Sequence, residues 1–172
     1  MSNWGKYVLA ALGIAVAGRI VAVDATPRLL MSFAIGRLGG GGFNQWRLAP
    51  RVTEHSRAIV RPAPDFAYSA CAYDLGRGPV RIRVAPSADY WSLSLYAANS
   101  DNFFVTDDRE SRAGAEIVLV RRGRRAPEGA RVVESPSRRG VALIRRLAPT
   151  VQSYNAAAEA AREDECAPLR AG

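Results

Sequence analysis

The 172-residue sequence predicts a mainly β fold: an antiparallel β-sandwich or jelly-roll-like domain with an N-terminal membrane helix and a C-terminal helix. Three observations support this fold class. An apolar run lies close to the N-terminus, short alternating segments separated by turns fill residues 66–144, and an alanine-rich segment of helical spacing follows Thr150. Many short strands at such intervals are typical of a sandwich or jelly roll.

The apolar run begins at Tyr7 and contains no charged residue up to Gly18. Arg19 interrupts it, and Asp24 ends it after four more apolar residues. A helix needs about 20 residues to cross the hydrocarbon layer, and an arginine near a helix end can extend its charge to the interface. We therefore expect the run to be a single membrane anchor.

Two other interpretations of this run stay open. It could be a signal peptide cleaved after Ala25, where small residues surround the bond, or a buried helix of a soluble domain. Charge does not settle its orientation, because Lys6 and the free amine on one side are balanced by Arg19 and Arg28 on the other.

A second apolar stretch covers residues 28–36 and is too short to cross a membrane. Its spacing predicts an amphipathic helix on the membrane or against the domain, ended by the four glycines of 39–42. We divide the chain accordingly into a membrane anchor or signal segment at 1–27, an amphipathic segment and Gly-rich joint at 28–49, and a β domain with a C-terminal helix at 50–172.

The first three predicted strands cover residues 66–73, 80–84 and 90–96, and tight turns between them predict an antiparallel meander. Alternation assigns six side chains to the core: Val80, Ile82, Val84, Trp91, Leu93 and Leu95. Further strands are predicted at 116–120, 130–133 and 141–144. Thr150 is the expected N-cap of the last helix.

The central block resembles a bacterial family, the domain of unknown function numbered twelve fifty-four. The resemblance covers roughly residues 50 to 165. It rests on six segments: Arg61-Pro-Ala-Pro-Asp-Phe-Ala-Tyr-Ser69, Tyr73-Asp-Leu-Gly-Arg-Gly-Pro-Val80, Asp89-Tyr-Trp-Ser-Leu93, Asn99-Ser-Asp-Asn-Phe103, Glu134-Ser-Pro-Ser137 and Leu143-Ile-Arg-Arg146. The chain departs from the family at Ala63-Pro-Asp65, where relatives have a richer Asn/Asp run.

The resemblance implies a mainly β domain that is often exported, and some relatives carry an N-terminal membrane segment. It implies no activity. Together with the apolar run it predicts an uncharacterised envelope protein of the bacterial inner membrane. Its soluble domain would face the periplasm and have a structural or ligand-binding role.

Candidate ligand-binding residues are Asp65, Tyr68, Tyr96 and Asn102, which combine polar groups with aromatic rings on neighbouring predicted strands. The alternative function is a hydrolase or lyase that uses Asp65, Tyr68 and Asn102 in a polar pocket at one end of the sandwich. No cofactor is expected. No metal site is expected either, because the chain has a single histidine and two cysteines.

The two cysteines are Cys71 and Cys166. In an oxidising compartment they could join the first body strand to the C-terminal region. Such a bridge would close a loop of about 95 residues and stabilise the fold by roughly 4–5 kcal/mol. In the cytosol both thiols would stay reduced.

The formal net charge of +8 raises the question of a nucleic-acid partner. Of the 24 basic residues 23 are arginine, which is typical of a GC-rich genome, and no aromatic residue is interleaved with the arginine pairs. We do not expect nucleic acid as a partner. The expected partners are the membrane, through the N-terminal helix, and an envelope protein or a small ligand.

Overall fold

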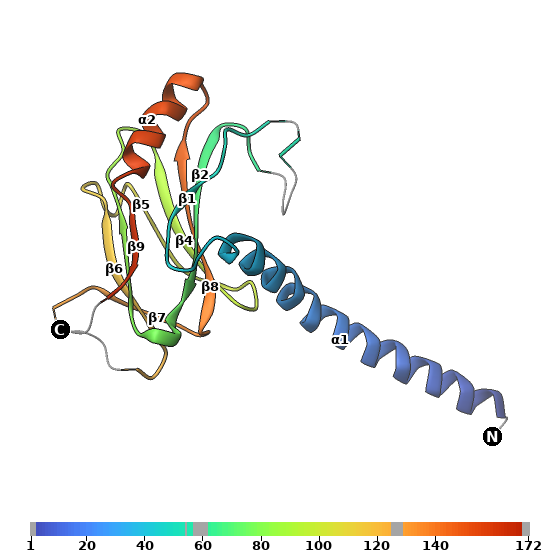
Figure 1. The fold of residues 1–172 in the computed structure, drawn as a ribbon. Helices are drawn as coiled ribbons and strands as arrows, with labels where there is room; N and C mark the ends of the chain where they lie inside the picture. The colour runs from blue at the N-terminus through green and yellow to red at the C-terminus, as the bar shows by residue number, and fades with distance from the viewer. Residues whose placement is uncertain (1–2, 54, 57–61, 125–128, 170–172) are drawn as a thin grey trace.

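A computed structural model describes residues 3–53, 55–56, 62–124 and 129–169. Among these residues the structure has two α-helices and nine strands (Figure 1). In chain order the elements are α1 (Asn3–Gly39), β1 (Arg47–Leu48), β2 (Phe66–Asp74), the 3-10 helix η1 (Leu75–Arg77), β3 (Val80–Val84), β4 (Trp91–Ala97), β5 (Asn102–Asp107), β6 (Ala115–Arg121), β7 (Val132–Ser135), β8 (Arg139–Leu147), α2 (Val151–Ala161) and β9 (Glu165–Pro168).

The strands form two sheets, which confirms the mainly β prediction. The five-stranded sheet has the order β1-β2-β8-β4-β5, and the four-stranded sheet has the order β7-β6-β3-β9. Every pair is antiparallel except β6 and β7, which run parallel. The second sheet is therefore mixed, whereas the sequence predicted antiparallel pairing throughout.

The predicted meander of the first three body strands is wrong. β2 and β4 belong to the five-stranded sheet but are separated by β8, and β3 lies in the other sheet. The chain crosses between the sheets through η1 after β2 and through residues 85–90 after β3. Alternation along a strand tells which side chains face a core, but it does not tell which strand lies alongside.

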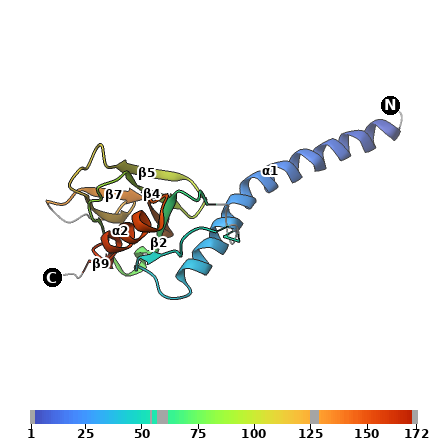
Figure 2. The same cartoon turned by 90° about the horizontal axis from the view of Figure 1, so that it is seen from above.

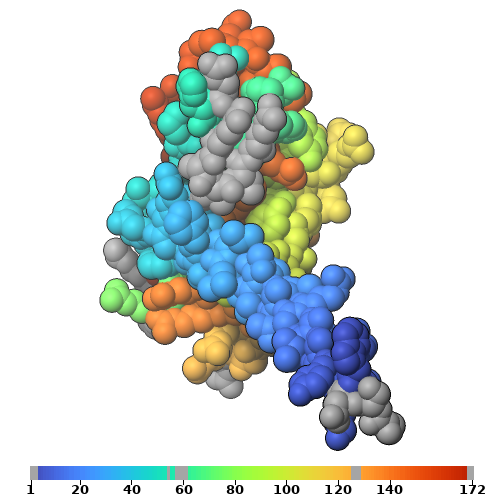
Figure 3. Space-filling model, turned by 90° about the vertical axis from the view of Figure 1, so that its right-hand side faces the viewer, coloured from blue at the N-terminus to red at the C-terminus, as the bar shows by residue number. Residues whose placement is uncertain are grey.

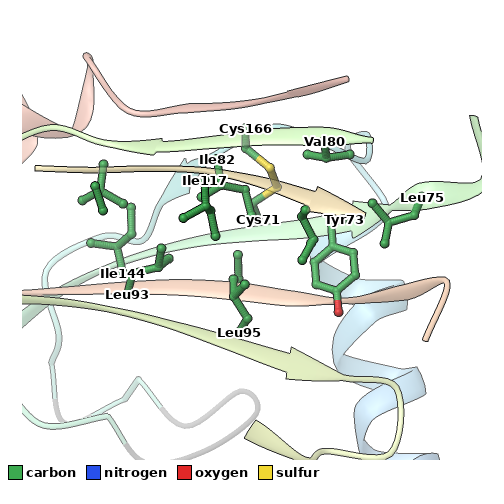
Figure 4. Packing of buried hydrophobic residues seen from close by; sticks show 14 of the residues in the cluster. Cys71, Tyr73, Leu75, Val80, Ile82, Leu93, Leu95, Ile117, Ile144 and Cys166 are labelled. Atoms are coloured by element: carbon green, nitrogen blue, oxygen red, sulfur yellow. A yellow bond between two sulfur atoms is a disulfide. The ribbon is translucent and has the colours of Figure 1, made fainter. Parts of the chain in front are cut away.

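Side chains from both sheets meet in one hydrophobic core (Figure 4). The side chains assigned to the core from alternation in β3 and β4 all belong to it and are at most 1% exposed. A disulfide between Cys71 of β2 and Cys166 of β9 crosses this core and joins the two sheets.

The helix α1 joins the two apolar stretches that the sequence pattern separates. It continues through Pro27, which has no N–H to donate to the carbonyl one turn earlier. Side chains donate to neighbouring carbonyls in this turn: Thr26 Oγ1 lies 2.6 Å from Ala22 O, and Arg28 Nη1 lies 2.6 Å from Asp24 O.

Only the C-terminal part of α1 packs on the domain, against β2 and β8 (Figures 1 and 2). Ile35 is buried there, and Ser100 Oγ donates a hydrogen bond to Pro27 O over 2.9 Å. The helix ends at Gly39, whose carbonyl accepts from the Gly42 N–H. Gly42 has a φ of +119°, a conformation that favours glycine.

The predicted C-terminal helix is confirmed as α2, and Thr150 is its N-cap. Thr150 Oγ1 accepts from the Ser153 N–H, and Ser153 Oγ accepts from the Thr150 N–H in return, which forms a capping box. Ala157 packs against Ala67 and Ala148, so small side chains let the helix approach one end of the larger sheet closely.

Candidate functional site

The N-terminal part of α1 is apolar and exposed along its whole length. All residues from 4 to 23 are exposed, and the large apolar side chains among them are 45–77% exposed. The segment Trp4–Gly39 contains an 18-residue window of mean hydropathy 2.0, of which none is buried. By length and composition this helix can cross a membrane, and a signal sequence has the same character.

The domain makes its first contact with α1 only one helical turn beyond this apolar segment. Asp24 and Arg28 form an exposed i,i+4 ion pair after Val23, and the hydrogen bond from Ser100 reaches Pro27. Figure 3 shows α1 crossing one face of the domain and continuing past its edge. A bilayer around residues 4–23 would therefore lie immediately beside the folded domain.

A row of four side chains crosses the outer face of the larger sheet, the face opposite the core. The register aligns Tyr68 of β2 with Arg145 of β8, Arg145 with Ser92 of β4, and Ser92 with Asp107 of β5. Their neighbours along the strands, such as Trp91 and Ile144, point into the core. Because side chains alternate between the faces, the four residues share the outer face. We call them the polar row.

Two members of the polar row have buried polar atoms without a hydrogen-bond partner. Ser92 is 1% exposed, and its Oγ has no partner among the described residues. The Nε of the half-buried Arg145 is likewise buried and without a partner. In the described part of the chain no carboxylate forms an ion pair with Arg145. Buried donors of this kind lose their hydration without compensation. The Nε atoms of Arg81 and Arg146 are also unpartnered, but both of those arginines form an ion pair with a carboxylate.

The outer members of the row are already engaged. Tyr68 Oη accepts a hydrogen bond from the Ala63 N–H over 3.0 Å. Asp107 Oδ1 accepts from the N–H groups of Arg109 and Glu110 and so caps the turn after β5. The unsatisfied groups are therefore confined to Arg145 and Ser92 at the centre of the row.

Aromatic rings lie along one side of the polar row. The ring centroids of Phe66 and Tyr68 are 6.4 Å apart, and those of Phe66 and Tyr90 are 6.2 Å apart in an edge-to-face arrangement. On the other side the row Ala70, Leu143, Ser94 and Val105 is mostly apolar, and Val105 is 52% exposed. The arrangement sets one cation and one hydroxyl in an apolar surface.

A second polar cluster surrounds Asp74 at the opposite end of β2. Its carboxylate accepts from Arg138, from Arg139 and from the Gly76 N–H. Burial raises the pKa of the Asp74 carboxyl, but these hydrogen bonds and the charge of Arg139 outweigh burial and lower the pKa to about 2. Because each group here has a partner, the cluster fixes the turn after β2 and offers no free ligand.

A third polar cluster lies inside the core and is structural. The guanidinium of Arg146 forms two hydrogen bonds with the Asp164 carboxylate, at 2.8 and 2.7 Å, and a third with Ala85 O. Asp164 Oδ1 also accepts from the Ala85 N–H. The charges are paired and the hydrogen bonds join β8, β3 and the turn before β9.

The four ligand-binding residues predicted from the sequence lie at two ends of the same sheet. Asp65 precedes β2, and Tyr68 lies near the start of that strand. Tyr96 of β4 pairs with Asn102 of β5. On its other side, across β8, Tyr96 lies level with Ala72, which is near the end of β2. The register therefore brings Tyr96 and Asn102 together but separates them from the other two. The geometry required for a hydrolase or lyase, in which Asp65, Tyr68 and Asn102 meet, is not observed.

Sequence reasoning missed Ser92 and Arg145, although a signal for both was present. Alternation with Trp91, Leu93 and Leu95 places Ser92 and Ser94 on the face opposite the core, and the tandem Arg145-Arg146 puts one arginine on each face of a strand. The sequence could not predict that Ser92 and Arg145 are neighbours, because their contact depends on β8 lying between β2 and β4.

No group of three or more His, Cys, Asp or Glu side chains within the described ranges could hold a metal ion. His55, the sole histidine of the sequence, is exposed.

Comparisons with known proteins give a family and a fold. The profile of a family described as "Protein of unknown function (DUF1254)" matches residues 43–168. No curated protein matches the chain in sequence.

The VPA0106 protein from Vibrio parahaemolyticus superposes with a TM-score of 0.68 at 13% identity, over 87% of this chain and 37% of that protein. A putative uncharacterized protein from Burkholderia cenocepacia has a TM-score of 0.43 at 13% identity, over 61% of this chain and 32% of that one. The chain thus spans well under half the length of the VPA0106 chain.

Proposed function

We propose that this chain, which belongs to the bacterial family of proteins of unknown function DUF1254, is an envelope protein anchored in the inner membrane by α1. Its β domain would face the periplasm, close to the membrane surface, and have a ligand-binding role. The two sheets that share one core support a sandwich arrangement for this domain.

The observation that carries the proposal is the division of α1 into an exposed and a docked part. A water-soluble protein rarely exposes so much continuous apolar surface, so the segment 4–23 calls for a lipid environment. The segment from Pro27 to Gly39 packs on the domain instead. An anchor that continues rigidly into the domain would hold it at a set distance from the bilayer.

The disulfide between Cys71 and Cys166 supports a periplasmic location. Both residues are at most 5% exposed and join the two sheets across the core. Stable disulfides are rare in the bacterial cytosol and common in exported proteins.

The test is fractionation of cells that express the full chain with a C-terminal tag. An anchored protein should stay in the membrane pellet after sodium carbonate extraction, keep the full-length mass and react with maleimide only after reduction. As a control for insertion, Leu12→Arg combined with Ile14→Arg should move the protein to the soluble fraction. Soluble wild-type protein with free thiols would overturn the proposal, and a soluble chain that begins after Ala25 would replace the anchor with a cleaved signal peptide.

A further inference from the structure

We infer that the centre of the polar row binds a small amphipathic carboxylate, with Arg145 and Ser92 holding the carboxylate group. The inference rests on the ligand-binding part of the proposed function and is independent of membrane anchoring. The VPA0106 match and the family give no ligand for this face, so the argument depends on the charges and burial of the residues themselves.

The first step is the charge of Arg145. Its side chain is half-buried between Tyr68 and Ser92 on the neighbouring strands, and its Nε is buried without a partner. Asp107, the acidic member of the row, lies two strands away, about 10 Å by strand spacing, and its Oδ1 is engaged with two backbone N–H groups. A guanidinium in this setting binds a planar anion well, because it can donate two parallel hydrogen bonds to a carboxylate.

The second step is the hydroxyl of Ser92. It is buried, unpartnered and on the strand beside Arg145, facing the same side of the sheet. A ligand oxygen held by Arg145 would be in a position to accept from this hydroxyl as well. One cation and one neutral donor match a single negative charge better than the two charges of a phosphate.

The third step is the apolar character of the surroundings. Phe66, Tyr68 and Tyr90 form a connected aromatic group on one side, and Leu143 and Val105 lie on the other. Apolar and aromatic surfaces around a few polar groups are typical of sites for small organic ligands. The ligand is therefore expected to carry a ring or short alkyl group beside its carboxylate.

The experiment uses the full chain, labelled with ¹⁵N-arginine, in micelles of a nonionic maltoside detergent. The Nε–H resonance of Arg145 is assigned through Arg145→Lys and followed during titration with phenylacetate. Phenylacetamide is the neutral isostere, acetate lacks the ring, and inorganic phosphate tests for binding of any anion. Phenylacetate should give a saturable shift, acetate should bind at least tenfold more weakly, and phenylacetamide should give no shift.

Three variants separate binding from folding. Arg145→Gln should weaken phenylacetate binding at least tenfold, measured by calorimetry, whereas Arg83→Gln, which removes an exposed arginine of β3, should leave it unchanged. Ser92→Ala should weaken binding about three- to tenfold without lowering the melting temperature, because it removes an unsatisfied buried hydroxyl. Near-UV circular dichroism confirms that each variant is folded.

The inference is overturned if phenylacetate gives no saturable shift, if phenylacetamide or phosphate binds as well, or if Arg145→Gln and Arg83→Gln behave alike. A protein that passes the fractionation test but fails this one would retain the anchored domain and lose only this ligand site. A protein that binds phenylacetate but fails fractionation would retain the site and lose the anchor.

Discussion

Two consecutive arginines at the end of β8 have opposite environments. Arg146 points into the core, where its side chain is 2% exposed and paired with the fully buried Asp164. Arg145 points to the outer face, where no carboxylate of the described residues forms an ion pair with it, although the Nε atoms of both arginines lack a hydrogen-bond partner. The strand's alternation alone creates this difference, because adjacent residues face opposite sides of the sheet. One arginine thereby stabilises the core, and its neighbour is the one to which we assign the proposed ligand.

The buried pair predicts a large effect at the residue scale. Asp164→Asn should lower the free energy of unfolding by about 3–5 kcal/mol, because it leaves the buried charge of Arg146 uncompensated. The measurement is urea unfolding of the full chain in nonionic micelles, followed by tryptophan fluorescence. Glu159→Gln breaks the exposed pair with Arg162 and is the control, with an expected change of about 0.5 kcal/mol or less. Equal effects of the two substitutions would contradict a structural role for the buried pair.

Asp74 predicts a dependence of stability on pH. Its pKa is about 2 in the folded chain and 3.8 ordinarily, so folding favours the charged carboxylate. This contribution is present in full above about pH 4 and is lost as the pH falls towards 2, because the unfolded chain takes up the proton first. After allowance for the half-exposed arginines, it amounts to about 1–2 kcal/mol.

The stability difference between the wild type and Asp74→Asn should therefore shrink as the pH is lowered from about 4 to about 2. Chemical unfolding curves at several pH values measure it. In 1 M salt the stability difference between the wild type and Asp74→Asn at pH 7 should be smaller, because salt partly screens the attraction of Arg138 and Arg139 to the Asp74 carboxylate. A difference that stays constant with pH would show that the ion pairs around Asp74 contribute nothing.

At the scale of the element, α1 has two sides beyond Pro27. Ile35 faces the domain and is 7% exposed, whereas Leu29, Leu30 and Phe33 face away and are 57–67% exposed. Residues 33 and 35 lie about 200° apart around a helix, so their side chains point to opposite sides of α1.

Ile35→Asp should release this part of α1 from the domain, because it introduces a charge into an apolar contact. Hydrogen–deuterium exchange of residues 27–38 should then increase several-fold, while exchange in β3 and β6 stays unchanged. Phe33→Asp is the matched control, since its side chain does not touch the docked face, and it should leave exchange near the wild-type rate. Undiminished protection in Ile35→Asp would show that the helix is held by other contacts.

At the scale of the whole molecule, the disulfide joins the edge strand of one sheet to an inner strand of the other. Cys166 lies on β9, a four-residue edge strand next to β3, and Cys71 lies on β2 between β1 and β8. The bond connects residues 95 positions apart, so it closes nearly the entire β domain into a loop. Its main effect is expected in the unfolded chain, which loses conformational freedom.

Replacing both cysteines, Cys71→Ala with Cys166→Ala, should lower the free energy of unfolding by about 4–5 kcal/mol at most. Urea midpoints with and without reductant measure this. The wild type should approach the double variant when reduced, and the variant itself should not respond to reductant. A double variant as stable as the oxidised wild type would contradict the prediction.

Much of the local structure was predictable from the residues. The faces of β3 and β4, the helix after Thr150 and the apolar character of the N-terminal helix follow from spacing and composition, which depend on neighbouring residues alone. The strands β5 and β9 were missed, because short segments with Asn, Asp or Pro at their ends lack a clear alternation. The continuity of α1 through Pro27 was also missed, since a proline ordinarily ends a helix.

What the sequence by itself determined is the type of the segments that have a clear periodicity, the sides of β3 and β4 that face the core, and the apolar helix at the N-terminus. These features depend on interactions over a few residues. Only the tertiary structure decided that β8 lies between β2 and β4, that Tyr68, Arg145 and Ser92 therefore share one row, and that α1 packs beside them. Strand partners are chosen by contacts between distant residues, and periodicity along the chain carries no information about them.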